Sequence, residues 1–326
     1  MHLALRRVIF AIFLLIFLIG APTIVFYTAG YRLIIANRHI QRTGALAINT
    51  QPRGSSIVLN GQDLAQKSPY VVQRIMPNTH SVTLTKKGYH DWSQRVQVDE
   101  GKTTYISTRL FADAQPTLLN AANSALALRA KPSHVEPLDD ASIHFINNGA
   151  NVEVRTGSVV SSQLIALLPL SDYTLLEEDA DYIILANEHL QAYVIQRDGG
   201  NVVELPTKIT AFDWLDDKHA LVWTDGSEVN IYDAISQERT FITREGNYIA
   251  DVAWHPEADS FFVVSGDSIQ AYDMAVHATR SVTQLLSDTP VLDIWLDAAG
   301  KNLYFLDSAP TNTTDTLFVN QLPLTL

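Results

Sequence analysis

The sequence predicts an all-β protein that consists of an N-terminal transmembrane helix, a small β-sandwich and a β-propeller-like repeat region of about five blades. Three observations carry this prediction. The stretch from Val8 to Tyr31 contains no charged residue, short strands alternate apolar and polar residues over 44–111, and similar segments recur over 117–326. Each pattern is typical of one architecture.

Composition divides the chain into a basic and an acidic half. The net charge of −12 combines residues 1–116, with 13 basic and 5 acidic residues, and residues 117–326, with 10 and 30. The acidic half repels phosphate backbones, so we expect no nucleic-acid partner. Cysteine is absent, which excludes disulfides, thiolate metal sites and a cysteine nucleophile. Apolar residues make up 47% of the chain, enough to form real cores.

The uncharged stretch 8–31 is long enough to cross a membrane, because a spanning helix needs about 20 apolar residues. A cleaved signal peptide is the alternative, since Arg6 and Arg7 precede the apolar run and Gly20-Ala21 offers a small-residue cleavage site. Apolar residues continue beyond Pro22, which lengthens the run past an ordinary signal peptide. We therefore favour an uncleaved anchor.

The short segment 1–7 before the helix predicts a cytoplasmic tail, with everything after Arg32 outside the membrane. Arginines flank both ends of the span, so the charge rule gives no clear bias, but long C-terminal domains translocate largely regardless of such charges. The expected location is the cell membrane, with a single pass and extracytoplasmic C-terminal domains.

Residues 44–111 predict a small β-sandwich. Asn60-Gly61 lies between two alternating runs and is the strongest short hairpin signal, because a type I′ turn needs positive φ at both central residues. Gly88 and Gly101 mark further turns. The expected strands are 45–50, 56–60, 70–75, 80–85, 93–98 and 103–110.

This stretch resembles the PEGA domain, a small β-sandwich named for a Pro-Glu-Gly-Ala signature. The signature position reads Pro52-Arg53-Gly54-Ser55, and Asn60-Gly61, Ser68-Pro69, Pro77 and Gly88-Tyr89 follow in the family's order. Arg53 and Ser55 depart from the signature, and Asn78 stands where the family usually has glycine. The resemblance implies an accessory module of envelope or surface proteins without catalytic residues.

Two aromatic residues in this module, Tyr89 and Trp92, are the candidate binding face. The alternative is that both belong to the core or rim of the sandwich, because aromatic side chains dominate small cores. We favour this structural interpretation.

The acidic half contains a repeat. Segments 209–234, 249–274 and 291–308 each read as an apolar strand ending near tryptophan, an acidic turn, and further apolar strands. Trp214, Trp254 and Trp295 are 40 and 41 residues apart. A period of about 40–45 residues is typical of propeller blades. A weaker copy at 172–196 brings the recognisable units to four, and 140–156 is a further candidate. A fifth unit is expected to be divided between the two ends of the region, and the length of the region divided by about 42 residues also gives about five blades.

The Trp254-His255-Pro256 and Trp295-Leu296-Asp297 turns resemble the Trp-Ser-Pro-Asp-Gly turn of TolB-type and WD-type propellers. The resemblance implies the fold and says nothing about a ligand. His255 holds a repeated turn position, so we expect it to be structural.

The sequence predicts no catalytic residue, no cofactor and no metal. No two of the ten histidines are close enough in sequence to form a local metal-binding pair, and no phosphate-binding loop or serine nucleophile motif occurs. Glu177, Glu178, Asp179 and Asp181 form the densest acidic cluster. A calcium-binding loop needs a central glycine, which this cluster lacks. We therefore interpret the cluster as a solvated turn.

The leading functional hypothesis is a non-enzymatic envelope protein whose propeller binds a protein or a polysaccharide. One alternative is a carbohydrate-active enzyme, which needs two carboxylates at roughly 5–9.5 Å beside an aromatic platform. The other is an architectural subunit of an envelope complex.

Overall fold

The computed structural model describes residues 3–28, 31–34, 39–129, 131, 143–158, 161–257, 259–275, 280–307 and 318–326. The chain forms two compact units. Unit 1 comprises Met1–Leu110 with Ala275–Ser281, and unit 2 comprises Phe111–Met274 with Val282–Leu326. Residues 1, 2, 29 and 30 of the expected tail and anchor lie outside the described residues.

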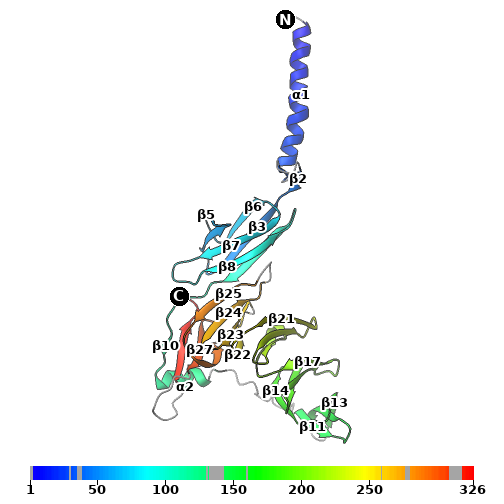
Figure 1. The fold of residues 1–326 in the computed structure, drawn as a ribbon. Coiled ribbons are helices and arrows are strands. Elements are labelled where there is room, and N and C mark those ends of the chain that lie inside the picture. The colour runs from blue at the N-terminus through cyan, green and yellow to red at the C-terminus, as the bar shows by residue number, and fades with distance from the viewer. Residues whose placement is uncertain are drawn as a thin grey trace. The chain divides into compact units, whose positions relative to one another are not determined.

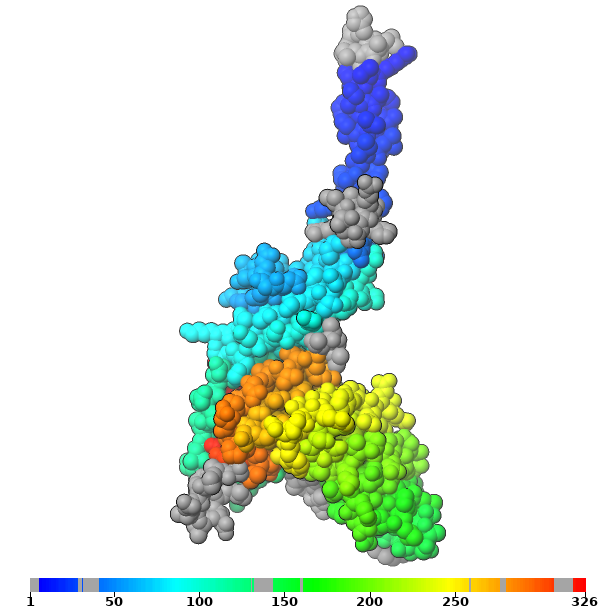
Figure 2. All heavy atoms as spheres, in the orientation of Figure 1, coloured from blue at the N-terminus to red at the C-terminus, as the bar shows by residue number. Residues whose placement is uncertain are grey.

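Unit 1 begins with helix α1 (Leu3–Thr28), whose apolar side chains are exposed along its length. Figure 2 shows this helix in blue, and none of its most apolar stretch is buried inside the structure. The hydroxyls of Thr23 and Thr28 donate to the carbonyls of Ile19 and Ile24, so these polar groups are satisfied inside the helix. Among the described residues, Arg6–Thr28 is the one helical stretch long and apolar enough to span a membrane, which fits an anchor or a signal sequence.

After a short antiparallel pair, β1 (Tyr31–Ile34) and β2 (His39–Arg42), the chain enters a β-sandwich. Residues alternate between buried and exposed along β8, as a strand with one face on a core requires. In the described part of unit 1 one sheet has the order β6-β3-β9 and the other β5-β4-β7-β8 (Figure 1). Their bounds are β3 Gly44–Gln51, β4 Ser56–Leu59, β5 Gln62–Lys67, β6 Tyr70–Ile75, β7 Asn78–Thr85, β8 Trp92–Val98 and β9 Thr103–Arg109.

The predicted hairpin turn at Asn60-Gly61 is confirmed. Leu59 pairs with Gln62, and Asn60 and Gly61 have φ of 51° and 79°, as a type I′ turn requires. The strand that follows this turn, β5, was not predicted. Most of its residues are polar and all but Leu64 are exposed, so it lacks the alternation that reveals a half-buried strand.

Unit 2 contains five successive sheets in its described part, which confirms the all-β, propeller-like prediction. In Figure 1 they run from the green β11–β13 through β14–β17, β18–β21 and β22–β25 to the orange and red β26–β28. The bounds are β11 Ile143–Asn147, β12 Val152–Ser158, β13 Ser161–Leu168, β14 Tyr173–Glu178, β15 Tyr182–Asn187, β16 Gln191–Gln196, β17 Val202–Lys208, β18 Ala211–Leu215, β19 Ala220–Thr224, β20 Glu228–Asp233, β21 Glu238–Arg244, β22 Ile249–Trp254, β23 Ser260–Ser265, β24 Ser268–Asp273, β25 Val282–Leu286, β26 Val291–Leu296, β27 Asn302–Asp307 and β28 Phe318–Pro323, with a 3₁₀ turn η1 at Asp216–Lys218.

The last sheet is completed by a strand from the beginning of the unit. β10 (Thr117–Leu118) pairs with β28, with Thr117 opposite Gln321. This agrees with the expected unit divided between the two ends of the region. Helix α2 (Ala121–Arg129) follows β10 and was not predicted. Its start is capped by Asn120, whose side-chain oxygen accepts from the Asn123 amide.

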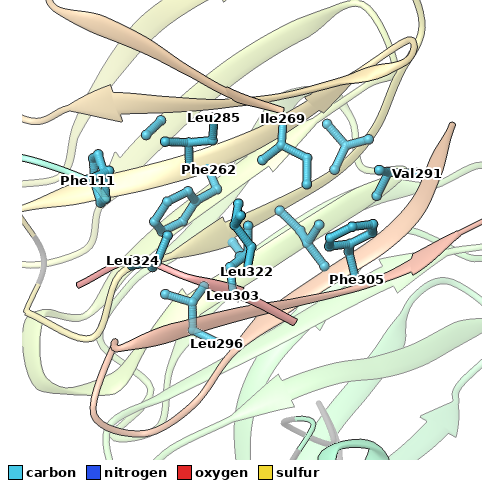
Figure 3. Close-up of a cluster of buried hydrophobic side chains, with 14 residues drawn as sticks. Phe111, Phe262, Ile269, Leu285, Val291, Leu296, Leu303, Phe305, Leu322 and Leu324 are labelled. Atoms are coloured by element: carbon cyan, nitrogen blue, oxygen red, sulfur yellow. The ribbon is translucent and has the colours of Figure 1, made fainter. Parts of the chain in front are cut away.

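Buried apolar clusters join each sheet of unit 2 to the next. One cluster links β22–β25 to β26–β28 through Phe262, Phe305 and Leu322 (Figure 3). Others link β18–β21 to β22–β25, β14–β17 to β18–β21, and β11–β13 to β14–β17. Among the described residues no buried cluster joins the first sheet to the last. Stacking of neighbouring sheets is therefore the main source of stability in this unit.

The expected equivalence of three tryptophans holds for two of them. Trp214 pairs with Leu221, and Trp254 pairs with Phe261. In the last sheet the equivalent pair is Leu296 with Leu303, so Leu296 and not Trp295 occupies the corresponding position. Trp295 lies one position earlier and faces the other way, because neighbouring residues of a strand point to opposite faces. Its indole donates to the Ala127 carbonyl of α2.

Candidate functional site

The predicted pair Tyr89 and Trp92 meets at the sandwich core. Trp92 is 2% exposed and belongs to the core cluster, while Tyr89 is half-buried and packs against the same cluster. Burial of Trp92 leaves Tyr89 as the member of the pair that can contact a partner. The binding face at this pair stays a prediction.

The signature turn of unit 1 is held by buried hydroxyl groups. Thr50 forms hydrogen bonds with Ser55 (3.0 Å) and Ser68, and it donates to the Pro52 carbonyl at 2.8 Å. The Ser55 amide donates to Ser68 at 3.1 Å. Ser55 is fully buried, so its departure from the signature alanine places a hydroxyl where these residues can satisfy it.

A second feature of unit 1 is a basic hollow of about 500 Å³ beside this turn. Lys67, Lys86, Lys87 and a single acidic residue, Asp91, are among the described residues that line it. Lys86 donates to the Arg53 carbonyl at 2.9 Å. These three lysines contribute to the net positive charge of residues 1–116.

The densest acidic cluster is not the solvated turn that the sequence predicts. Asp179 is 9% exposed, and its carboxylate accepts from the Trp214 indole at 2.9 Å and from Nδ1 of His219 at 3.0 Å. Its other oxygen accepts the amides of Asp181 and Tyr182. The turn therefore joins the sheet β14–β17 to the sheet β18–β21. Among the described residues, no group of histidine, aspartate and glutamate side chains could hold a metal ion.

His255 joins two further sheets. Its side chain is fully buried, Nε2 donates to the Gly300 carbonyl at 3.1 Å, and Nδ1 accepts the Glu257 amide at 3.2 Å. Gly300 has a φ of 62°, and a Cβ there would lie 2.4 Å from the His255 ring. Only glycine fits this close approach, so His255 has the structural role that its repeated position predicts.

A cavity of about 880 Å³ lies in unit 2. It is lined mainly by the first strands of three successive sheets, β18, β22 and β26, and by Lys131. Each of these strands places one aspartate in its wall: Asp213, Asp251 and Asp293. Tryptophan and phenylalanine side chains line the same space, so acidic and aromatic groups meet in one cavity.

Two of these carboxylates bind the backbone of the next sheet. Asp213 accepts the Trp254 amide at 2.6 Å, and Asp251 accepts the Ile294 amide at 2.8 Å. Burial raises the pKa of Asp251 well above its usual value, and the neighbouring Asp293 raises it further, while the Ile294 amide opposes the shift. The aspartates therefore fix the spacing of the inner strands as well as lining the cavity.

The third carboxylate, Asp293, pairs with Lys131. The Lys131 Nζ also lies 5.6 Å from the centre of the Trp295 ring, within the range of a cation–π contact. An ammonium group is thus held between a carboxylate and an indole face. This arrangement suits recognition of a cation.

Sequence reasoning missed this cavity, although a signal was present. The strands AFDWL, IADVAW and VLDIWL each contain one aspartate in an otherwise apolar run. A carboxylate inside a buried strand needs partners, so its recurrence indicates a shared polar site.

The comparison with protein families agrees with the architecture of unit 1. The PEGA domain family model matches residues 43–112, which confirms the resemblance found at 44–110. No curated protein matches the chain.

Solved structures of β-propellers match at low identity. The complex of KlAtg21 with the coiled-coil of AgAtg16 has 11% identity and a TM-score of 0.42, covering 76% of this chain and 77% of that one. Hsv2p from Kluyveromyces lactis has 11% identity and a TM-score of 0.35, covering 70% and 68%. The Cps50 (Swd1) beta-propeller domain of Myceliophteria_thermophila has 12% identity and a TM-score of 0.34, covering 42% and 52%.

The chain thus contains a segment, 43–112, that matches the PEGA domain, and a propeller-like repeat region in unit 2. The likeness to solved structures concerns the fold alone, so function has to be argued from the site.

Proposed function

We propose that this chain is a non-enzymatic, membrane-anchored protein of the cell envelope whose unit 2 binds a protein or polysaccharide partner. In this proposal residues 1–7 are a cytoplasmic tail and residues 8–31 the anchor. The PEGA domain at 44–111 is a spacer, and the repeat region at 117–326 is the binding platform outside the membrane. The exposed apolar surface of α1 supports the anchor.

The observation that carries the proposal is the cavity lined by β18, β22 and β26. Its volume of about 880 Å³ lies within the roughly 300–1,000 Å³ typical of ligand sites. Asp213 and Asp251 are engaged by backbone amides, and Asp293 by Lys131. Carboxylates tied in this way build a rigid wall, which favours recognition over reaction.

Site-specific crosslinking in intact cells tests the platform. A photoreactive residue at Ala298, an exposed position in the cavity wall, should capture a partner from the envelope. The control position is Ile235, which is 68% exposed in a turn away from this wall. Equal products from both positions, or none from Ala298, would contradict the proposal.

Protease treatment of intact cells tests the orientation. If unit 2 is extracytoplasmic, it should be digested once any outer layer has been opened. Protection until the cell membrane is lysed would place unit 2 in the cytoplasm and would remove the envelope part of the proposal.

One observation favours a second candidate, a carbohydrate-active enzyme. Burial raises the pKa of Asp251, as a general acid needs, and aromatic residues line the same cavity. However, Asp251 and Asp293 are within hydrogen-bonding contact, whereas paired glycosidase carboxylates stand about 5 Å or more apart. Hydrolysis of an envelope polysaccharide that is abolished in Asp251→Asn would establish this candidate.

A further inference from the structure

We infer that the cavity of unit 2 binds a lysine side chain of a basic partner segment, and that Lys131 is an internal occupant of the same place. The inference rests on the proposed platform and names the chemistry of its partner. It begins from the one ammonium group that the described wall of the cavity already holds.

The geometry around Lys131 is that of a binding site for ammonium. Its Nζ pairs with the Asp293 carboxylate and lies over the Trp295 ring at 5.6 Å. A carboxylate and an indole face together stabilise a cation more than either alone, because the carboxylate supplies charge and the ring supplies its negative face. Both groups are fixed. Asp293 lies in the strand β26, and the Trp295 indole donates a hydrogen bond to the Ala127 carbonyl.

The cavity has charge for more than one cation. Asp216, Asp217 and Asp297 line it together with the three strand aspartates, and Lys131 is the only basic residue among the described lining residues. The repeat region as a whole carries 10 basic and 30 acidic residues. A concave acidic surface concentrates field lines and attracts cationic segments from a distance.

Lys131 is placed so that it can be exchanged. Its side chain is 34% exposed, and it belongs to no strand of the cavity wall. A partner lysine that takes its place regains the same carboxylate and the same indole face. Because a partner lysine can bind only when Lys131 has left, the apparent affinity for the partner equals the intrinsic affinity multiplied by the fraction of time that the site is empty.

Peptide binding to the full chain in detergent micelles tests the inference. The probe is a fluorescent hexalysine peptide, with hexaglutamate as the charge control. Wild type should bind hexalysine and not hexaglutamate. Lys131→Ala and Lys131→Met, the second of which keeps most of the alkyl stem, should each bind hexalysine about tenfold more tightly, because the internal competitor is gone.

Asp293→Asn should weaken hexalysine binding about tenfold, since it removes the paired charge. Two matched variants change the same charges elsewhere. Lys301→Ala and Asp267→Asn lie at exposed turn positions, and both should stay within about twofold of wild type. Thermal unfolding of every variant confirms that the compared proteins are folded.

Several results would overturn the inference. They are absence of hexalysine binding, equal binding of hexaglutamate, and unchanged affinity in both folded Lys131 variants. Crosslinking from Ala298 separates this failure from failure of the platform. If crosslinking from Ala298 gave specific products but hexalysine did not bind, the platform would be retained and its ligand would belong to another chemical class. Lysine binding without products would retain the ligand chemistry and remove the envelope platform.

Discussion

One buried polar network in each unit shows a difference in chemistry. In unit 1 this network consists of the hydroxyls of Thr50, Ser55 and Ser68, which lie within one sandwich. In unit 2 the carboxylates of Asp179 and Asp251 lie at junctions between neighbouring sheets. Hydroxyls do not change charge in the ordinary pH range, whereas carboxylates do.

This difference shows where each unit is sensitive. A sandwich with one core can lose a neutral hydrogen bond at small cost, because its apolar core remains complete. A series of stacked sheets depends on each junction, and a carboxylate there leaves several donors unpaired when it is lost.

Trp223→Ala should have the largest effect. Trp223 is fully buried in the cluster between β14–β17 and β18–β21, and its indole donates to Thr207 at 3.0 Å. Truncation of a buried tryptophan costs about 3–5 kcal/mol. Urea unfolding followed by hydrogen exchange should show unit 2 destabilised and unit 1 unchanged.

The matched variant in unit 1 is Leu84→Ala, which removes a fully buried side chain from the sandwich core at a cost of about 2–5 kcal/mol. It should destabilise unit 1 alone. If either variant lowered the stability of both units equally, the two would unfold as one cooperative body, and the comparison would not hold.

Asp179→Ala should come next. The Trp214 indole, the His219 ring and two backbone amides lose their acceptor, and unpaired buried donors cost about 1–3 kcal/mol. Chemical denaturation should show a loss of about 2–3 kcal/mol in unit 2. Asp172→Ala, at an exposed position nearby, should change stability by less than about 0.5 kcal/mol.

Asp251→Asn should stabilise unit 2 at neutral pH. Burial raises the pKa of Asp251 in the folded state above its ordinary value of 3.8, and Asp293 adds to the shift. As the pH rises from 3.8, the unfolded chain releases this proton first, so stability falls until the pH passes the folded pKa. Asparagine does not ionise, so its advantage over wild type should vanish as the pH falls towards 3.8.

Asp225→Asn provides the opposite case in the same unit. Burial acts to raise the pKa of Asp225, but hydrogen bonds from the Glu228 and Ser227 amides outweigh it, and the pKa is lowered. Its contribution is present above the ordinary value and lost as the pH falls through the folded pKa. This variant should therefore be destabilised at neutral pH. If both variants changed the free energy of unfolding in the same direction at neutral pH, the opposite pKa shifts of Asp251 and Asp225 would be contradicted.

Ser55→Ala should have the smallest effect. It restores the alanine of the PEGA signature and removes one hydroxyl, while Thr50 keeps its bonds to Pro52 and Ser68. We expect a loss of no more than about 1 kcal/mol in unit 1 and no change in unit 2. A loss as large as that of Asp179→Ala would show that the hydroxyl cluster is as critical as the carboxylate junction.

Much of the fold could be predicted because local patterns determine it. The period of two in strands such as β8 and the Asn60-Gly61 turn act within a few residues, and the repeat brings the same pattern back in each sheet. The mostly exposed strand β5 lacked that pattern. Trp295 was misaligned because its partner, α2, lies more than 160 residues away in sequence.

The site could not be predicted because it depends on contacts between sheets. Asp179 looked like a turn residue, and only the stacking of sheets brings Trp214 and His219 onto its carboxylate. Asp251 and Asp293 are 42 residues apart and meet through the same stacking. Sequence spacing gives the period of the sheets but not which side chains face one another across them.

The pairing of β10 with β28 has a consequence for the order of events during synthesis. Thr117 and Gln321 are 204 residues apart, so β10 leaves the ribosome long before its neighbour exists. The sheets from β14 to β25 can form as they emerge, since their strands are consecutive. The last sheet cannot form until β28 has been synthesised, and until then β10 and α2 lack the strand on which they pack. A chaperone or translocation factor that shields exposed strands has its longest opportunity at this segment.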